Sequence, residues 1–213
     1  RQGKAIALRA ARDGAKIAVV AKTVEPQPKL PGTIHTAVEE IETAGGEGLA
    51  CVADIRFEDQ VEAAVDKAVQ QFGGLDILVN NAAVFHKDRL ADVTEANVMS
   101  EFWPNLFAPL FLIRSFAARA ESGRIVNMLD RRIVSDDVEC GPYLLSKKGL
   151  YALTRLAALE LAPRFTVNGV APGVLLPPPG KDDAYMRQHG GVVPLNYQCT
   201  PEDIADAVVY LVE

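Results

Sequence analysis

Tyr143 and Lys147 are the residues of this sequence whose types and spacing could do acid–base chemistry. They lie four positions apart in Gly141-Pro-Tyr-Leu-Leu-Ser-Lys147, so on a helix they share one face. A neighbouring ammonium favours the phenolate and lowers the pKa of a tyrosine from its ordinary value of about 10. Tyr143 would then exchange a proton with a carbonyl-like or imine-like substrate. An ordinary tyrosine and a solvated lysine on an amphipathic helix would show the same spacing.

Composition and charge limit the classes of protein to which the chain can belong. Its 213 residues are 49% hydrophobic and carry a formal net charge of -6, which fits one domain and argues against nucleic-acid or membrane-surface binding. No apolar run approaches the ~20 residues of a transmembrane helix. The three cysteines and three histidines form neither a disulfide framework nor a metal pattern. We therefore expect a cytoplasmic, reducing setting and no metal site.

The elements that must position Tyr143 and Lys147 alternate between helix and strand. Helices are indicated by apolar residues at helical spacing, and strands by short apolar runs typical of buried parallel strands. The expected helices are 3–13, 33–44, 58–72, 95–119, 142–162 and one capped by Thr200, and the expected strands are 17–21, 49–53, 75–79, 124–128 and 165–170. This alternation predicts one α/β domain over residues 1–213, with a mainly parallel, doubly wound sheet flanked by helices.

Polar and glycine-containing segments follow the predicted strands. The segments are Lys22, Asp54-Ile55, Asn80-Asn-Ala-Ala83, Asp130 and Ala171-Pro-Gly173, in the order of the strands they follow. A doubly wound sheet binds its ligand at the carboxyl ends of the strands. The sequence therefore predicts a ligand site along one edge of the sheet.

The ordered set of these residues resembles the short-chain dehydrogenase/reductase family over nearly the whole chain. It consists of Asn80-Asn-Ala82, Asn105, Asp130, Tyr143 with Lys147, and Pro172-Gly173. The resemblance implies a Rossmann-like fold, a nicotinamide cofactor and hydride transfer to a small-molecule substrate. It implies that Tyr143 exchanges the proton, that Lys147 binds the nicotinamide ribose and tunes the tyrosine, and that Asn105 holds a water of the proton relay. Asn105 would also fit a plain kink residue between Pro104 and Pro109.

Asp130 stands 13 positions before the tyrosine, where the family usually has a serine. A carboxylic acid relays a proton only when protonated, and near Tyr143 its charge would oppose a lowering of the tyrosine pKa by Lys147. Both properties suit a reductase in which Tyr143 and Asp130 deliver protons. Aspartate at this position is similar to the pteridine reductases of the family. The alternative is a plain turn or cap residue.

Three other segments also resemble pteridine reductases. Phe85 stands where they carry the aromatic residue that sandwiches the pterin, although a loop aromatic packed on the core would fit as well. Arg1-Gln-Gly3 resembles their Arg-x-Gly segment, and Asn168–Gly173 with 175–180 resembles their substrate loop. Residues 3–82 instead resemble the hydroxysteroid dehydrogenase-like 2 proteins. A pteridine-like substrate and a carbonyl or hydroxysteroid-type substrate therefore both stay open.

The end of the strand 17–21 favours NADP(H) as cofactor. An acidic residue there would bind the ribose of NAD and repel a 2′-phosphate, but Ala21 is neutral and Lys22 is basic. A merely solvated Lys22 is the alternative. Asp54 is expected to meet the adenine. The other expected cofactor-binding residues are Arg1, Gly3, Ile55, Asn81, Ala82, Ala83, Tyr143, Lys147, Pro172 and Gly173.

The first and last strands of a complete Rossmann domain have no counterpart in the sequence. Such a domain needs a first strand and a glycine-rich turn to hold the pyrophosphate, and Arg1-Gln-Gly3 supplies only the end of that turn. We expect the sequence to be part of a longer chain. The alternative is a non-catalytic Rossmann-like binding or scaffold protein.

The predicted helix 95–119 carries more apolar residues than one sheet face needs. They include Phe102, Leu106, Phe107, Leu110 and Phe111. This surplus predicts a homodimer or homotetramer formed through the helix, and a purely internal core role is the alternative.

Overall fold

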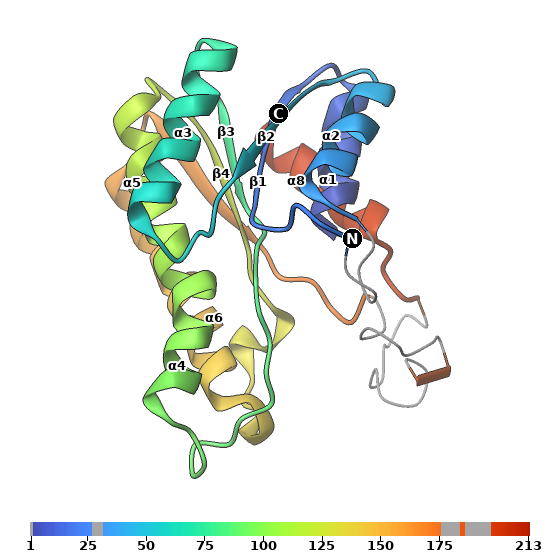
Figure 1. The fold of residues 1–213 in the computed structure, drawn as a ribbon. Helices are drawn as coiled ribbons and strands as arrows, with labels where there is room; N and C mark the ends of the chain where they lie inside the picture. The colour runs from blue at the N-terminus through green and yellow to red at the C-terminus, as the bar shows by residue number, and fades with distance from the viewer. Residues whose placement is uncertain (1, 27–31, 176–183, 186–196) are drawn as a thin grey trace.

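The computed structural model describes residues 2–26, 32–175, 184–185 and 197–213. Its strands are β1 (Lys16–Ala21), β2 (Glu47–Val52), β3 (Ile77–Asn80), β4 (Gly123–Met128) and β5 (Phe165–Val170). Its helices are α1 (Gln2–Arg12), α2 (Ile34–Thr43), α3 (Glu58–Phe72), α4 (Glu95–Phe102), α5 (Ala108–Arg119), α6 (Gly141–Glu160) and α8 (Pro201–Val212). The predicted alternation of helix and strand is confirmed (Figure 1).

The strands form two parallel sheets within the described residues, where the sequence predicted one. β1 pairs with β2, and β3, β4 and β5 pair in that order. The chain passes from one sheet to the other through α3. A further ladder on β1 would need a strand about 4.8 Å away, and none of the described segments pairs there. Every pairing within the two sheets is parallel, as in doubly wound folds.

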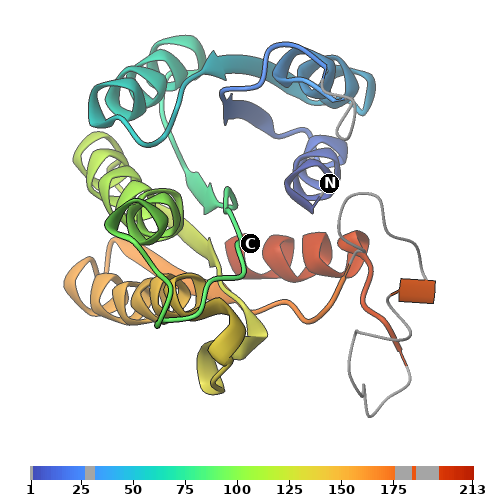
Figure 2. The same cartoon turned by 60° about the horizontal axis from the view of Figure 1, so that its bottom comes forward.

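Helices cover both faces of the strands (Figures 1 and 2). The side chains of β4 alternate between these layers, as the twofold period of a strand requires. Ile125 packs with Phe116 of α5 and Ala157 of α6. Val126 and Met128 point the other way, into a cluster with Ile6 of α1 and with Ile204, Ala205 and Val208 of α8. β4 is therefore buried on both faces, as a parallel strand at the centre of a layered fold should be.

The long helix predicted over 95–119 is interrupted. α4 ends at Phe102, a π-helical turn spans Trp103–Phe107, and α5 begins at Ala108. Pro104 lacks the backbone N–H that a continuous α-helix requires, and wide turns of this kind interrupt helices at such positions. The turn places the fully buried Asn105 toward the loop after β3. The helical stretch has the predicted bounds 95–119, and it differs from the prediction in the π-helical turn that contains Pro104.

Two short 3-10 helices between β4 and α6 were not predicted. They are η2 (Arg131–Val134) and η3 (Val138–Cys140). Each begins with an aspartate whose side chain accepts a backbone N–H two residues on, Asp130 for η2 and Asp137 for η3. These two caps shape the segment that lies against the start of α6. None of the helices in the described ranges combines the length and apolar character needed to cross a bilayer.

Candidate active site

Tyr143 and Lys147 lie on the buried face of α6, as their spacing predicted. Their relative exposures are 7% and 3%. Pro142 occupies the first turn of the helix, where a missing N–H costs no hydrogen bond. The Lys147 ammonium donates to the carbonyl of Met128 at the carboxyl end of β4, with Nζ and O 2.7 Å apart. This contact ties the helix to the strand end that the sequence predicted as the ligand edge.

Asp130 lies directly beside Tyr143. The tyrosine hydroxyl donates to Asp130 Oδ2, and the two oxygens are 2.7 Å apart. The same carboxylate accepts from the backbone N–H of Arg132 at 2.8 Å, and from its guanidinium Nε at 3.1 Å and Nη2 at 3.2 Å. Asp130 is therefore both the cap of η2 and the partner of Tyr143, which combines the two roles that the sequence left open.

The charges around Tyr143 hold it protonated. Burial alone would raise the pKa of Asp130, but hydrogen bonds from Arg132 and Tyr143 outweigh burial and lower it below its ordinary value. Burial and the Asp130 carboxylate raise the pKa of Tyr143 well above its ordinary range. The sequence led us to expect a lowering by Lys147. Burial instead lowers the pKa of Lys147 to about 8, against the opposing charges of Asp130 and Glu101.

Asn105 connects three elements through its side chain. Its Oδ1 accepts from the backbone N–H of Val84 at 3.0 Å, and its Nδ2 lies 3.1 Å from the Val84 carbonyl. Nδ2 also lies 2.9 Å from Glu101 Oε2 and 3.1 Å from Ser146 Oγ on α6. Asn105 thus holds the loop after β3 against the helix that carries Tyr143. It is a residue of the helix kink as well as a neighbour of the site.

Glu101 is a member of this network that sequence reasoning missed. Its side chain is fully buried, and Oε1 lies 2.7 Å from both the backbone nitrogen and Nδ1 of His86. Together Glu101 and Asn105 hold the backbone from Val84 to His86. Phe85, between them, meets the edge of the Tyr143 ring with the ring centroids 4.8 Å apart. A carboxylate four positions before Asn105, and so on the same helix face, was the available signal.

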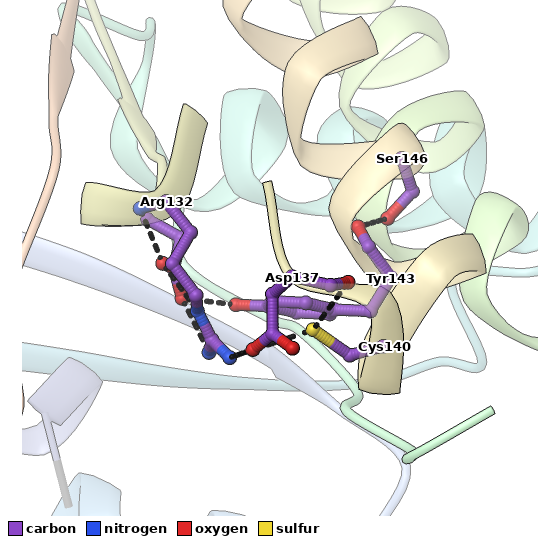
Figure 3. A network of polar contacts seen from close by, with 6 residues as sticks. Arg132, Asp137, Cys140, Tyr143 and Ser146 are labelled. Carbon is purple, nitrogen blue, oxygen red and sulfur yellow. Dashed lines mark hydrogen bonds and ion pairs between the residues drawn. The ribbon is translucent and has the colours of Figure 1, made fainter. Parts of the chain in front are cut away.

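Arg132 was also missed by the sequence reasoning. Its guanidinium carbon lies 5.2 Å from the centroid of the Phe85 ring and 5.4 Å from that of Tyr143. Nη1 donates to Asp137 Oδ2 at 3.2 Å. Figure 3 shows Arg132, Asp137 and Cys140 gathered beside Tyr143. Nothing in the sequence singled out this arginine, because its role depends on the fold of η2.

The predicted cofactor residues at the ends of β1 and β2 lie near each other in a more exposed setting. Lys22 Nζ lies 3.5 Å from Asp54 Oδ2, and Asp54 also accepts from Arg56 Nε at 3.0 Å. The hydrogen bonds of Arg56 hold the pKa of Asp54 well below its ordinary value, although partial burial raises it. Ile55 follows in the turn, partly buried.

Gly3 and Asn81 lie against each other among the predicted cofactor residues. Gly3 lies in the first turn of α1, and a Cβ there would collide with the Asn81 side chain. Ala82, Ala83 and Gly173 are exposed at the same set of strand ends. The Pro172 carbonyl accepts from the backbone N–H of Arg131 at 3.2 Å, which joins this segment to η2.

Two of the sequence predictions concern residues that are not described. Arg1 and most of the predicted substrate loop, residues 176–180, lie outside the described ranges. Within those ranges, no group of three or more His, Cys, Asp or Glu side chains could hold a metal ion.

A family model and curated relatives match this chain over spans that differ in length. A family model described as Enoyl-(Acyl carrier protein) reductase matches residues 3–213. Hydroxysteroid dehydrogenase-like protein 2 of Homo sapiens is 35% identical over 210 residues, which is 96% of this chain and 49% of that protein. The Xenopus laevis protein of the same name is 68% identical over 81 residues, 38% of this chain and 19% of that protein. The chain spans at most about half the length of these relatives.

Solved structures share the fold. A short-chain type dehydrogenase/reductase from Mycobacterium marinum has a TM-score of 0.87 at 25% identity and covers 100% of this chain and 83% of that one. FolM Alternative dihydrofolate reductase 1 from Brucella canis, complexed with NADP, has a TM-score of 0.86 at 28% identity, covering 99% and 82%. NAD+-bound xylitol dehydrogenase has a TM-score of 0.87 at 26% identity, covering 100% and 88%. With the match over residues 3–213, these likenesses establish that the chain belongs to the short-chain dehydrogenase/reductase family.

Proposed function

We propose that this chain is an NADPH-dependent reductase that acts on a pteridine-like C=N bond or on a carbonyl group. The observation that carries the proposal is the 2.7 Å hydrogen bond from the Tyr143 hydroxyl to Asp130. A carboxylate in this position keeps the tyrosine protonated, and reduction needs a proton donor. Oxidation would need Tyr143 as a base, which the same carboxylate opposes.

Bound NADPH would supply a hydride to the carbon of the substrate double bond. Tyr143 would give its proton to the substrate nitrogen or oxygen, so that one hydride and one proton complete the reduction. Loss of that proton leaves a phenolate beside the Asp130 carboxylate, and like charges raise the proton affinity of the pair. The pair therefore takes up the next proton from solvent. In this arrangement Tyr143 is the first donor, and Asp130 carries a proton only after Tyr143 has lost its own.

The residues at the strand ends fit a dinucleotide. At Gly3, where a Cβ would strike Asn81, the backbone can approach closely, and glycines serve this purpose beside a pyrophosphate. Asn80 Oδ1 is buried without a hydrogen-bond partner in the described part of the chain, so it is free for a ligand donor. Lys22 favours the 2′-phosphate of NADPH, and the structural neighbour FolM is complexed with NADP. NADH is the competing cofactor, because another structural neighbour, xylitol dehydrogenase, is bound to NAD+.

Phe85 supports a planar, pteridine-like substrate. Its ring is 45% exposed although it touches Tyr143, so one side of an aromatic residue stays available next to the proton donor. The name of the FolM neighbour points the same way, since dihydrofolate carries a pteridine ring. The name of the curated relatives favours instead a carbonyl or hydroxysteroid-type substrate.

A substrate panel separates these possibilities. NADPH consumption is measured with dihydrobiopterin and dihydrofolate, and in parallel with aldehydes, ketones and ketosteroids. We expect turnover with at least one pteridine, and its absence in Tyr143→Phe. Turnover with carbonyl compounds alone would leave the second substrate class. If no substrate is turned over and NADPH does not bind, as measured by its fluorescence, the proposal is overturned. A non-catalytic binding protein would then be the remaining interpretation.

We also infer that the chain assembles with copies of itself through α5 and α6. Exposed apolar side chains include Leu110 on α5 and Leu156 and Leu159 on α6, with exposures of 39%, 64% and 81%. Light scattering should give a mass of two or four chains. Leu159→Glu should shift it toward the monomer, and an unchanged mass would place the interface elsewhere.

A further inference from the structure

We propose that Arg132 is a positioning residue for the reduction, because it locks Asp130 as a pure hydrogen-bond acceptor for Tyr143. The inference depends on the proposed function only where turnover is the readout. The arrangement of donors around Asp130 can be tested without any substrate.

Among the described residues, the Asp130 carboxylate is the acceptor in each of its four hydrogen bonds. Oδ1 receives the backbone N–H and Nε–H of Arg132 at 2.8 and 3.1 Å. Oδ2 receives the Arg132 Nη2–H and the Tyr143 hydroxyl at 3.2 and 2.7 Å. A protonated carboxyl group must donate its own hydrogen. Among these four contacts only the hydroxyl can turn to accept one, so protonation of Asp130 would break or reverse the contact with Tyr143.

The Arg132 side chain is itself held in place. Its third guanidinium nitrogen, Nη1, donates to Asp137, which caps η3, and the guanidinium lies over the rings of Phe85 and Tyr143. Only 25% of the side chain is exposed. The planar fork of an arginine can bind both oxygens of one carboxylate while it stacks on an aromatic face, and a lysine cannot. The contacts therefore specify arginine and not merely a positive charge.

The other charged and titratable groups nearby do not replace Arg132. Lys147 on α6 acts on Asp130 through its charge, but its hydrogen bond goes to Met128. Asp137 and Cys140 face Arg132, and Glu101 on α4 acts on Tyr143 and Lys147. Burial raises the pKa of the Cys140 thiol to about 11, so it is neutral at ordinary pH. In the described part of the chain, Arg132 is thus the cation in direct contact with Asp130.

When Arg132 is removed, burial should determine the protonation state of Asp130. A half-buried carboxyl group that has lost two charge-assisted hydrogen bonds favours its neutral form. It would then titrate at a higher pH and donate to the Tyr143 oxygen. The geometry of proton delivery would change at pH values where the wild-type carboxylate is constant.

The test follows the carboxyl carbon of Asp130 by ¹³C NMR during a pH titration, with the signal assigned through Asp130→Asn. Arg132→Gln should raise the titration midpoint by at least one pH unit, a tenfold change in proton affinity, and Arg132→Lys should give a smaller rise. Arg131→Gln is the matched control, because the Arg131 side chain is exposed, and it should leave the midpoint unchanged. Should Arg132→Gln fail to fold, the Arg132→Lys titration decides alone.

A second readout is the pH profile of NADPH consumption with the best substrate of the panel. In Arg132→Gln the acid limb should move upward by the same amount as the Asp130 midpoint. An Asp130 midpoint that is the same in both Arg132 variants and the wild type would overturn the inference, whatever the activity. A shifted Asp130 midpoint with no turnover in any variant, wild type included, would support the positioning role of Arg132 and contradict the proposed function.

Discussion

The polar side chains at the carboxyl end of β4 are buried and hydrogen-bonded to one another, whereas Lys22 at the end of β1 faces solvent. Tyr143 and Lys147 are 7% and 3% exposed. The side chain of Lys22, by contrast, is 64% exposed, and its contact with Asp54 is a loose 3.5 Å. The acid–base groups thus have their geometry fixed by the protein alone. Lys22, the residue predicted to meet the 2′-phosphate of the cofactor, is exposed and can exchange water for a ligand.

The two sheets differ in the same way. In β4, every residue except Arg124 is buried, while no residue of β1 is. A strand covered on both faces is rigidly placed, and so are the side chains that follow it. Within the described residues β1 is paired along one edge, so fewer contacts fix its position. The three-stranded sheet positions the predicted acid–base residues and part of the predicted cofactor contacts, whereas the two-stranded sheet is followed by Lys22, Asp54 and Ile55.

The largest effect should come from Tyr143→Phe. Loss of the hydroxyl removes the proton donor and should lower kcat by about 10²–10⁴-fold, the usual contribution of a positioned acid. The melting temperature and NADPH binding should change little, because the ring still packs on Phe85. Steady-state kinetics and a thermal melt check this, and a variant with more than a tenth of wild-type kcat would refute the assignment.

Glu101→Gln tests whether the buried network of Glu101, His86 and Asn105 contributes more to stability than the exposed contacts of β1 and β2. The amide would place a donor against the donors of His86 or Asn105, and should lower the free energy of unfolding by about 2–3 kcal/mol. The control is Glu47→Gln on β2, whose side chain is 47% exposed near Lys16, and which should change it by less than about 0.5 kcal/mol. Urea unfolding measures both. Equal decreases in the free energy of unfolding for the two variants would contradict the proposed difference between the two regions.

The pH dependence should report Lys147. Its pKa is lowered by burial from 10.5 to about 8, so the ammonium is present below pH 8 and is lost as pH rises. Turnover that needs this charge should fall about tenfold per pH unit above that point. Between about pH 8 and 10.5 the unfolded chain binds the proton more tightly, so this group makes the protein more stable as pH rises there. Lys147→Arg, if active, should lose the alkaline limb, and an unchanged limb would assign it to another group.

The smallest effect is expected at the exposed edge. Lys22→Ala should weaken NADPH binding by roughly tenfold and leave NADH binding unchanged, because only NADPH carries the 2′-phosphate. Cofactor fluorescence titrations measure both. The effect should also shrink as salt is added, since the pair is exposed. Equal losses for the two cofactors would show that Lys22 does not read the phosphate.

Several elements were predictable because their signals are local. The helix 58–72 and the strand 165–170 have the predicted bounds, and Thr200 caps α8 as its sequence indicated. Within 95–119 the prediction missed the π-helical turn, because apolar periodicity runs through the turn without marking it. It also missed η2 and η3, which depend on single aspartate caps and not on any periodic pattern.

By itself, the sequence determined the alternation of helix and strand and the shared face of Tyr143 and Lys147, and it predicted a ligand site at the strand ends. These features follow from the spacing of residues along the chain, because the period at which apolar residues recur distinguishes a helix from a strand. The tertiary structure alone decided that Asp130 meets both Tyr143 and Arg132, that the buried Glu101 contacts His86, and that the pKa of Tyr143 rises. Charge and proton affinity depend on burial and on partners from distant segments, and neither exists until the chain is folded.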